Sequence, residues 1–241
     1  MNKLLLSSKE VFKKMGIYGI VSSKSKRIIR MENRIKTIYY YKKFRPKESF
    51  TFQGKTFEYF WVEKNFVCIN ERTVEIPIIW EQVKQNRNKR ILEIGNVLSQ
   101  YFPINHDVVD KYEKAEGVIN EDVVDFQPSE NYDLIVSIST LEHVGWDEKP
   151  KEAKKILRAI DNLKNCLAPK GKIMVTMPLG WNTEMDRLLE EDKIPFTKRY
   201  FLKRISRDNR WKETTWNEVS GSKFGDPFHC ANGLVIGVIE T

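Results

Sequence analysis

The 241-residue chain has few cysteines and no long apolar run. Its three cysteines, Cys68, Cys166 and Cys230, are far apart and form no Cys-x-x-Cys pair, so neither a disulfide framework nor a zinc site is expected. No apolar stretch approaches the roughly 18–20 residues of a membrane span, and the leucine run at residues 4–6 is too short for a signal peptide. These absences favour a cytoplasmic protein.

Signatures of nucleotide and nucleic-acid binding are also missing. No Gly-Lys-Ser/Thr P-loop occurs, and no second glycine follows Gly95 at the spacing of a dinucleotide fingerprint. The aromatic-plus-arginine motif of RNA-binding domains is absent, so nucleic acid is not expected as a partner. With 41% hydrophobic and 12% aromatic residues, the chain nonetheless has enough apolar side chains to fold around a substantial core.

Positive charge is concentrated at the beginning of the sequence. Residues 1–47 contain 14 Lys and Arg but 2 Asp and Glu, a net charge of +12, whereas the whole chain carries +8. Leu4, Val11, Phe12 and Ile20 recur among these lysines at roughly helical spacing. We therefore expect a basic helical arm that contacts an anionic membrane peripherally, without inserting. A solvated helix packed on its own domain is the alternative.

Residues 48–89 show the pattern of a β hairpin followed by a helix. Phe50, Phe52 and Phe57 alternate with polar residues on either side of a turn at Gln53-Gly54-Lys55. The segment 74–84 then has helical spacing, with a proline near its start. This unit is expected to lead into a larger domain over residues 90–241.

Predicted strands and helices alternate along residues 90–241. Short apolar runs that end at glycine or acidic residues predict strands, and three- and four-residue apolar steps predict helices. Nearly continuous Val and Ile in the strands indicate a sheet covered on both faces, an α/β fold. The predicted strands span residues 91–94, 107–110, 117–119, 132–137, 172–177, 199–205 and 233–240.

Small and polar residues stand where these strands end. In an open parallel sheet the ligand lies beyond the carboxyl ends of the strands, near the point where strand order reverses. Three carboxylates at neighbouring strand ends suit a ligand with hydroxyl and amino donors, whereas any one of them alone could simply cap a helix. The strand-end residues are Glu93, Gly95, Asn96, Asp110, Asp122, Ser137 and Ser139.

Several of these residues fall in segments that resemble the motifs of class I S-adenosylmethionine-dependent methyltransferases of type 11. Ile91-Leu92-Glu93-Ile94-Gly95-Asn96 resembles the first motif, and Asp110 stands at the family's acidic position after the second strand. Further resemblances follow in the family's order at residues 121–123, 132–137, 141–144 and 167–172.

The resemblance implies a Rossmann-like sheet of seven strands in the order 3-2-1-4-5-7-6, preceded by the basic helical arm and the β hairpin. It also implies S-adenosylmethionine as cofactor, with a small-molecule or glycan-type acceptor. The implied cofactor contacts are Glu93, Gly95 and Asn96 at the amino-acid half, Asp110 at the ribose, Asp122 and Val123 at the adenine, and in addition Ser137.

His143 follows the fourth predicted strand, close to where the resemblance implies that the methyl group points. Its ordinary pKa range suits a catalytic base at neutral pH, although packing at a helix start would equally place a histidine there. The stretch 141–144 also resembles quinone-biosynthesis O-methyltransferases, in which a carboxylate three residues before the glutamate helps to bind a metal. Ser139 occupies that position here, so no metal is expected.

Departures from the family pattern keep two other functions open. Val97 and Ser99 replace the later glycines of the first motif, and the gaps from Glu93 to Asp110 and on to Gly117 are too short for full helices. The first two crossovers are therefore expected to be short or irregular. A catalytically degenerate methyltransferase-like binding module and a nucleotide-sugar-handling Rossmann enzyme are the alternative functions.

Overall fold

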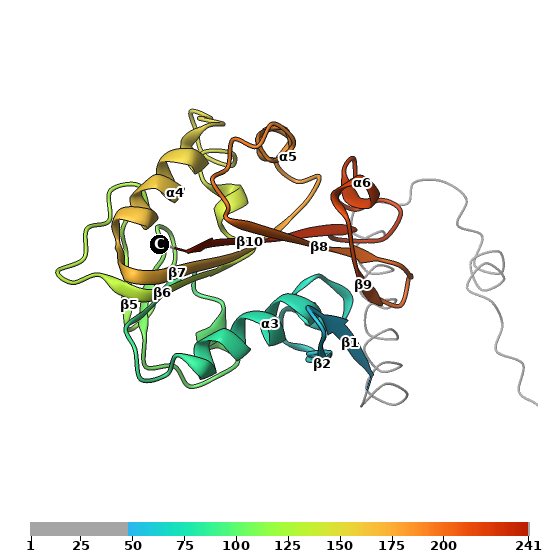
Figure 1. The fold of residues 1–241 in the computed structure, drawn as a ribbon, viewed down its shortest axis with the longest axis horizontal. Coiled ribbons are helices and arrows are strands. Elements are labelled where there is room, and N and C mark those ends of the chain that lie inside the picture. Colours follow the sequence, from blue (N-terminus) through green and yellow to red (C-terminus); the bar gives the residue numbers. More distant parts are fainter. Residues whose placement is uncertain (1–47, 241) are drawn as a thin grey trace, which may run out of the picture.

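A computed structural model describes residues 48–240; the basic arm predicted for residues 1–47 lies outside this range. The described part has a central sheet with helices on both of its faces (Figure 1). No helix within residues 48–240 is long and apolar enough to cross a membrane. The division of the chain into segments 48–89 and 90–241 stays a prediction.

The central sheet contains eight of the strands in the described range. The pairs β5–β4, β4–β3, β3–β6 and β6–β7 are parallel, whereas β7–β10, β10–β8 and β8–β9 are antiparallel. The strands are β3 (Ile91–Ile94), β4 (Asp107–Val109), β5 (Val118–Ile119), β6 (Tyr132–Ile138), β7 (Leu167–Pro178), β8 (Lys198–Arg204), β9 (Trp211–Thr214) and β10 (Gly233–Glu240).

The predicted strand order is present, but the prediction of seven strands is wrong by one. The order across the sheet is β5-β4-β3-β6-β7-β10-β8-β9, which becomes 3-2-1-4-5-7-6 when β9 is set aside and the others are numbered along the chain. The additional strand β9 pairs with β8 at the edge. The buried Trp211 holds it there, because its backbone N–H donates to the Tyr59 hydroxyl over 2.9 Å and its indole N–H donates to Asn209 Oδ1 over 2.8 Å.

Two hydrophobic clusters hold the layers together, one on each face of the sheet. On one face, α4 (Lys155–Asn165) and α5 (Thr183–Glu190) bury their apolar stripes against the strands (Figure 1). On the other face, α3 (Arg72–Gln85) packs beside the hairpin of β1 (Ser49–Phe52) and β2 (Lys55–Glu58). The predicted hairpin is confirmed, since its strands pair antiparallel around the turn at Gln53 and Gly54.

The connections that leave β3 and β4 are short and irregular, as predicted. One turn of 3-10 helix, η2 (Leu98–Gln100), follows β3, and residues 110–117 join β4 to β5 without a helix. Turns rather than helix N-termini therefore border the carboxyl ends of these two strands, and side chains of the turns form the ligand-facing surface there.

Candidate functional site

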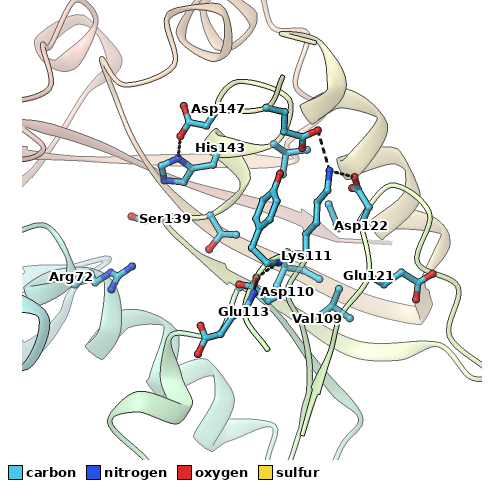
Figure 2. A pocket seen from close by; sticks show the side chains of 17 residues that line it. Arg72, Val109, Asp110, Lys111, Glu113, Glu121, Asp122, Ser139, His143 and Asp147 are labelled. Carbon is cyan, nitrogen blue, oxygen red and sulfur yellow. Dashed lines mark hydrogen bonds and ion pairs between the residues drawn. The ribbon is translucent and has the colours of Figure 1, made fainter. Parts of the chain in front are cut away.

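A cavity of about 530 Å³ opens at the carboxyl ends of β3, β4 and β6. Its volume is within the range of small-molecule sites. It also lies where strand order reverses, because β4 and β6 flank β3 in the sheet. Figure 2 shows its lining side chains, which come from the last residues of β3 and β4, from the turns after four strands and from the start of α3.

The structure brings five of the predicted site residues together around this cavity. Gly95 follows β3, Asp110 follows β4, Asp122 and Val123 follow β5, and His143 ends the short helix η3 (Leu141–His143) after β6. All of them line the cavity. These positions are those at which the sequence analysis expected ligand contacts.

Three other predicted site residues, Glu93, Asn96 and Ser137, do not line the cavity. Ser137 is fully buried inside β6, because that strand continues to Ile138, and its hydroxyl donates to the Ile94 carbonyl over 3.1 Å. Asn96 is nearly buried, and its side-chain amide donates to Glu113 Oε1 over 2.9 Å. Ser137 and Asn96 do not face the cavity, but they hydrogen-bond to residues that line it.

Glu93 fixes the turn that follows β3. It is fully buried, and its Oε1 accepts backbone N–H groups from Val97 and Leu98 over 2.9 and 2.8 Å. Its Oε2 lies 3.0 Å from His106 Nε2. Val97 and Ser99 occupy the positions of the later glycines in this turn. The buried Glu93 carboxylate fixes the turn by accepting its backbone N–H groups.

Replacing Glu93 by alanine should lower the free energy of unfolding by about 2–4 kcal/mol, because two N–H donors and a buried imidazole lose their acceptor. Urea denaturation at pH 7 measures the change. Glu93→Gln keeps one acceptor oxygen and should recover part of the loss. Unfolding curves for Glu93→Ala that match those of the wild type would contradict this role.

Asp110 joins the turns after β3 and β4. Its Oδ1 accepts the backbone N–H groups of Tyr112 and Glu113, each over 2.8 Å, and its Oδ2 accepts that of Asn96 over 3.4 Å. A carboxylate has about four lone-pair positions, so Oδ2 keeps capacity for a ligand hydroxyl. Asp110 therefore both shapes the cavity and faces it.

Asp122 belongs to a cluster of alternating charges with Lys111, Glu148 and Lys155. Its Oδ2 lies 2.8 Å from Lys111 Nζ and 2.5 Å from Lys155 Nζ, and both lysines also contact Glu148 (Figure 2 shows the Lys111 contacts). Burial acts to raise the pKa of Asp122, but the hydrogen bonds from the two lysines outweigh it and lower that pKa to about 2. Asp122 is thus ionised and largely occupied by protein cations.

Arg72, which the sequence analysis did not single out, comes from the start of α3 and lines the cavity (Figure 2). Within the described residues, its guanidinium has no hydrogen bond or ion pair. Its charge acts weakly on the buried Glu75 and Glu142, and a guanidinium with free N–H groups on a cavity wall is suited to an anionic ligand group. No local motif marks this arginine, because the packing of α3 on the sheet is what brings it to the site.

His143 lies between two carboxylates. Its Nδ1 is 2.5 Å from Asp147 Oδ2, and its Nε2 is 3.5 Å from Glu142 Oε1. Its ring also meets the indole of Trp181 edge to face, with the ring centroids 5.5 Å apart. The Asp147 contact, which Figure 2 shows, favours a proton on Nδ1 and leaves Nε2 as the nitrogen able to accept one.

Two buried carboxyl groups stand behind this part of the wall. Glu75 of α3 is fully buried, and burial together with the charge of Glu71 raises its pKa to about 7. Burial also raises the pKa of Glu142 well above its ordinary range, with a smaller contribution from the charge of Glu75. Neither Glu142 oxygen has a hydrogen-bond partner among the described residues.

The raised pKa of Glu75 predicts a pH-dependent stability. The folded state binds this proton more tightly than the unfolded state, whose glutamate titrates near the ordinary value of 4.5, so this contribution is lost as pH rises from about 4.5 to about 7. Relative to wild type, Glu75→Gln should gain up to about 3 kcal/mol in unfolding free energy across that interval. Urea denaturation at a series of pH values measures this difference. A difference between the two proteins that does not change with pH would contradict the prediction.

The described residues contain no group of three or more His, Cys, Asp and Glu side chains arranged to hold a metal ion. Most carboxylates of the cavity are instead engaged by backbone N–H groups, by the Asn96 amide, by lysines or by His143. The arrangement therefore offers hydrogen-bond acceptors, one free guanidinium and apolar surface from Ile94, Val109 and Val123 to an organic ligand.

No known family model and no curated protein sequence matches the chain. Among solved structures, the N-methyltransferase NodS from Bradyrhizobium japonicum with S-adenosyl-L-homocysteine is similar over 71% of this chain and 91% of its own, with 15% identity and a TM-score of 0.41. A SAM-dependent methyltransferase from Archaeoglobus fulgidus covers 68% and 93%, with 12% identity and a TM-score of 0.40. The sugar N-methyltransferase KedS8 from Streptoalloteichus covers 69% and 87%, with 12% identity and a TM-score of 0.36. Similarities this weak say nothing about the site or substrate of this chain.

Proposed function

We propose that the chain is an S-adenosylmethionine-dependent methyltransferase that acts on a small-molecule or glycan-type acceptor. The observation that carries this proposal is the convergence of Gly95, Asp110 and Val123 on one cavity at the switch point of a 3-2-1-4-5-7-6 sheet. The order of the motifs along the chain supports the same cofactor.

The cavity has groups that fit each part of this cofactor. Asp110 Oδ2 has acceptor capacity for ribose hydroxyls, and Val109 and Val123 give an apolar surface for adenine. Arg72 would bind the carboxylate of the amino-acid half. We assign Asp122 a supporting role at the adenine end, because Lys111 and Lys155 occupy its Oδ2. Glu93, Asn96 and Ser137 would act indirectly, by fixing the turns.

The bound cofactor would supply an electrophilic methyl group, and the chain would align an acceptor with it. His143 is the proposed base. Asp147 Oδ2 contacts its Nδ1, and Glu142 Oε1 lies 3.5 Å from its Nε2. These contacts would let His143 take the proton that the acceptor loses.

Replacing His143 by alanine should reduce kcat by about 10²–10⁴-fold if the residue acts as a general base. The dissociation constant for S-adenosylhomocysteine should change less than twofold, because none of the proposed cofactor contacts involves the imidazole. Methyl-transfer kinetics and calorimetry separate the two effects. A variant with wild-type kcat would remove His143 from the chemistry.

The proposal is tested by incubating the full chain with a cell extract and S-adenosylmethionine labelled in its methyl group. We expect label to appear in a discrete small-molecule or glycan product, which mass spectrometry then identifies. If the protein binds no cofactor, the proposal fails.

A degenerate binding module is the second candidate, because Asp122 is occupied by lysines and the first motif lacks its later glycines. Cofactor binding without any transfer of label would favour this module over the enzyme.

A further inference from the structure

The wall of the cavity after β6 offers acceptors and no hydroxyl donors. Ser139 and Thr140 both line the cavity, but each donates its proton inward. The Ser139 hydroxyl donates to Glu75 Oε1 over 2.7 Å, and the Thr140 hydroxyl donates to the Ile138 carbonyl over 3.0 Å. Only the oxygen lone pairs of these hydroxyls are left for a ligand, which must therefore bring the hydrogen-bond donor.

The carboxyl groups behind this wall would be stabilised in their ionised form by a cationic ligand group. Glu75 and Glu142 are both fully buried, and Asp147 contacts the other side of the His143 ring. The charge of Arg72, which lines the same cavity, acts weakly on both carboxyl groups, and the cofactor carboxylate would neutralise it. A buried carboxylate without a compensating cation costs several kcal/mol, or else keeps a proton. A cationic ligand group would let these carboxyl groups ionise beside it.

Two aromatic side chains that do not line the cavity, Trp181 and Phe224, lie next to His143. Trp181 meets the His143 ring on one side and Phe224 on the other, with centroid distances of 5.5 and 4.9 Å, and 37% of Trp181 is exposed. Asp186 lies beneath the same loop, where its Oδ2 accepts the Gly180 N–H over 2.9 Å and its buried Oδ1 has no partner among the described residues. An indole beside carboxylates is a favourable environment for an ammonium group.

We propose that the methyl acceptor is a primary or secondary amine that docks as an ammonium between Ser139, His143 and Trp181, in front of the buried Glu75 and Glu142. Its N–H groups donate to the Ser139 and Thr140 oxygens, and its charge compensates the carboxylates. Glu75 acts as a positioning residue through its hydrogen bond with Ser139. A hydroxyl acceptor would satisfy the lone pairs but would bring no positive charge to the buried carboxyl groups.

This inference rests on the proposed methyl transfer and specifies its acceptor. The ammonium first loses a proton to His143 Nε2, which frees the nitrogen lone pair. The nitrogen then forms a bond to the methyl carbon while the methyl–sulfur bond of the sulfonium donor breaks, and the electron pair of that bond stays on sulfur. The products are the N-methylated ammonium, the neutral thioether and an imidazolium that returns its proton to solvent.

Chemical blocking of amines tests the proposal with the full-length protein. One extract is divided into an untreated part, a part treated with sulfosuccinimidyl acetate to acetylate amines, and a part treated with N-ethylmaleimide to block thiols. After the reagents are consumed, each part receives enzyme and methyl-labelled S-adenosylmethionine. N-acetylation should reduce labelling of small molecules at least tenfold, and thiol blocking should change it less than twofold. In parallel, amino sugars and biogenic amines are assayed as methyl acceptors, each beside its hydroxyl analogue.

Glu75→Gln, with Glu190→Gln as the matched control on the exposed surface of α5, adds a readout on the enzyme. Glu75→Gln should lower kcat/KM for the labelled amine at least tenfold while changing S-adenosylhomocysteine affinity less than twofold, and Glu190→Gln should change neither. Label that survives N-acetylation, label found on oxygen, or intact cofactor binding with no amine methylated would overturn the amine assignment. Absence of cofactor binding would instead contradict the proposed function.

Discussion

Replacing Gly95 by alanine is expected to abolish cofactor binding and to lower the free energy of unfolding by about 2–4 kcal/mol. Gly95 has a φ of +83°, a conformation that costs energy for any residue with a Cβ atom. An added Cβ would also lie 2.2 Å from Thr140 Oγ1 and 2.9 Å from Thr140 Cβ. Either the turn after β3 or the wall after β6 must move, and both border the cavity.

Gly117→Ala is the matched control for this substitution. Gly117 has a similar φ of +77°, but nothing lies within 4 Å of the Cβ it would gain. The Gly117→Ala variant should therefore lose about 1–2 kcal/mol of unfolding free energy from backbone strain alone, and its cofactor affinity should be unchanged. Thermal unfolding and calorimetric titration with S-adenosylhomocysteine measure both variants. If Gly95→Ala lowers stability and cofactor affinity no more than Gly117→Ala does, the close packing of the turns after β3 and β6 is not essential.

Asp110→Ala should weaken S-adenosylhomocysteine binding by about 10–100-fold, which corresponds to roughly 1–3 kcal/mol for a lost hydrogen bond to a charged group. The loss combines a direct contact with a loosened cavity, because Asp110 also accepts the N–H groups of Tyr112 and Glu113. Asp110→Asn keeps one acceptor oxygen for these N–H groups and should have an intermediate effect.

The control for Asp110 is Asp125→Ala, which removes an exposed carboxylate outside the cavity lining. It should leave the titration unchanged. An Asp110→Ala protein that binds with wild-type affinity would mean that this cavity is not the cofactor site, whatever the activity of the chain.

Strand periodicity and strand-end residues predicted the parallel half of the sheet and several of the residues that line the cavity. Gly95 and Asp110 were predictable because each directly follows a short apolar strand, and parallel strands bring their carboxyl ends to one edge, whereas Val123 was predicted from the resemblance of residues 121–123. The prediction that Ser137 contacts the ligand was wrong because the predicted strand ended one residue too early. The strand β6 continues to Ile138, so Ser139 is the first residue beyond it and lines the cavity.

The features that sequence reasoning missed depend on contacts between distant segments. The four residues of β9 have no strong strand pattern, and the Tyr59 hydroxyl that anchors Trp211 is 152 positions away. Arg72 and Glu75 precede the sheet, and the packing of α3 brings Arg72 to the cavity and Glu75 behind its wall. The pairing of Asp122 with Lys111 and Lys155 likewise needs two turns and the start of α4 to meet, so the sequence gave no sign that this acidic strand-end residue is paired with lysines.

Calorimetric titration of the full-length protein with S-adenosylhomocysteine tests the central claim most directly. The account predicts one molecule bound per chain, with a dissociation constant between about 1 µM and 1 mM, the usual range for enzyme substrates. It also predicts that Asp110→Ala weakens this binding while Asp125→Ala does not. A titration of the wild-type protein without binding heat at millimolar ligand, confirmed by an unchanged melting temperature, would contradict the account.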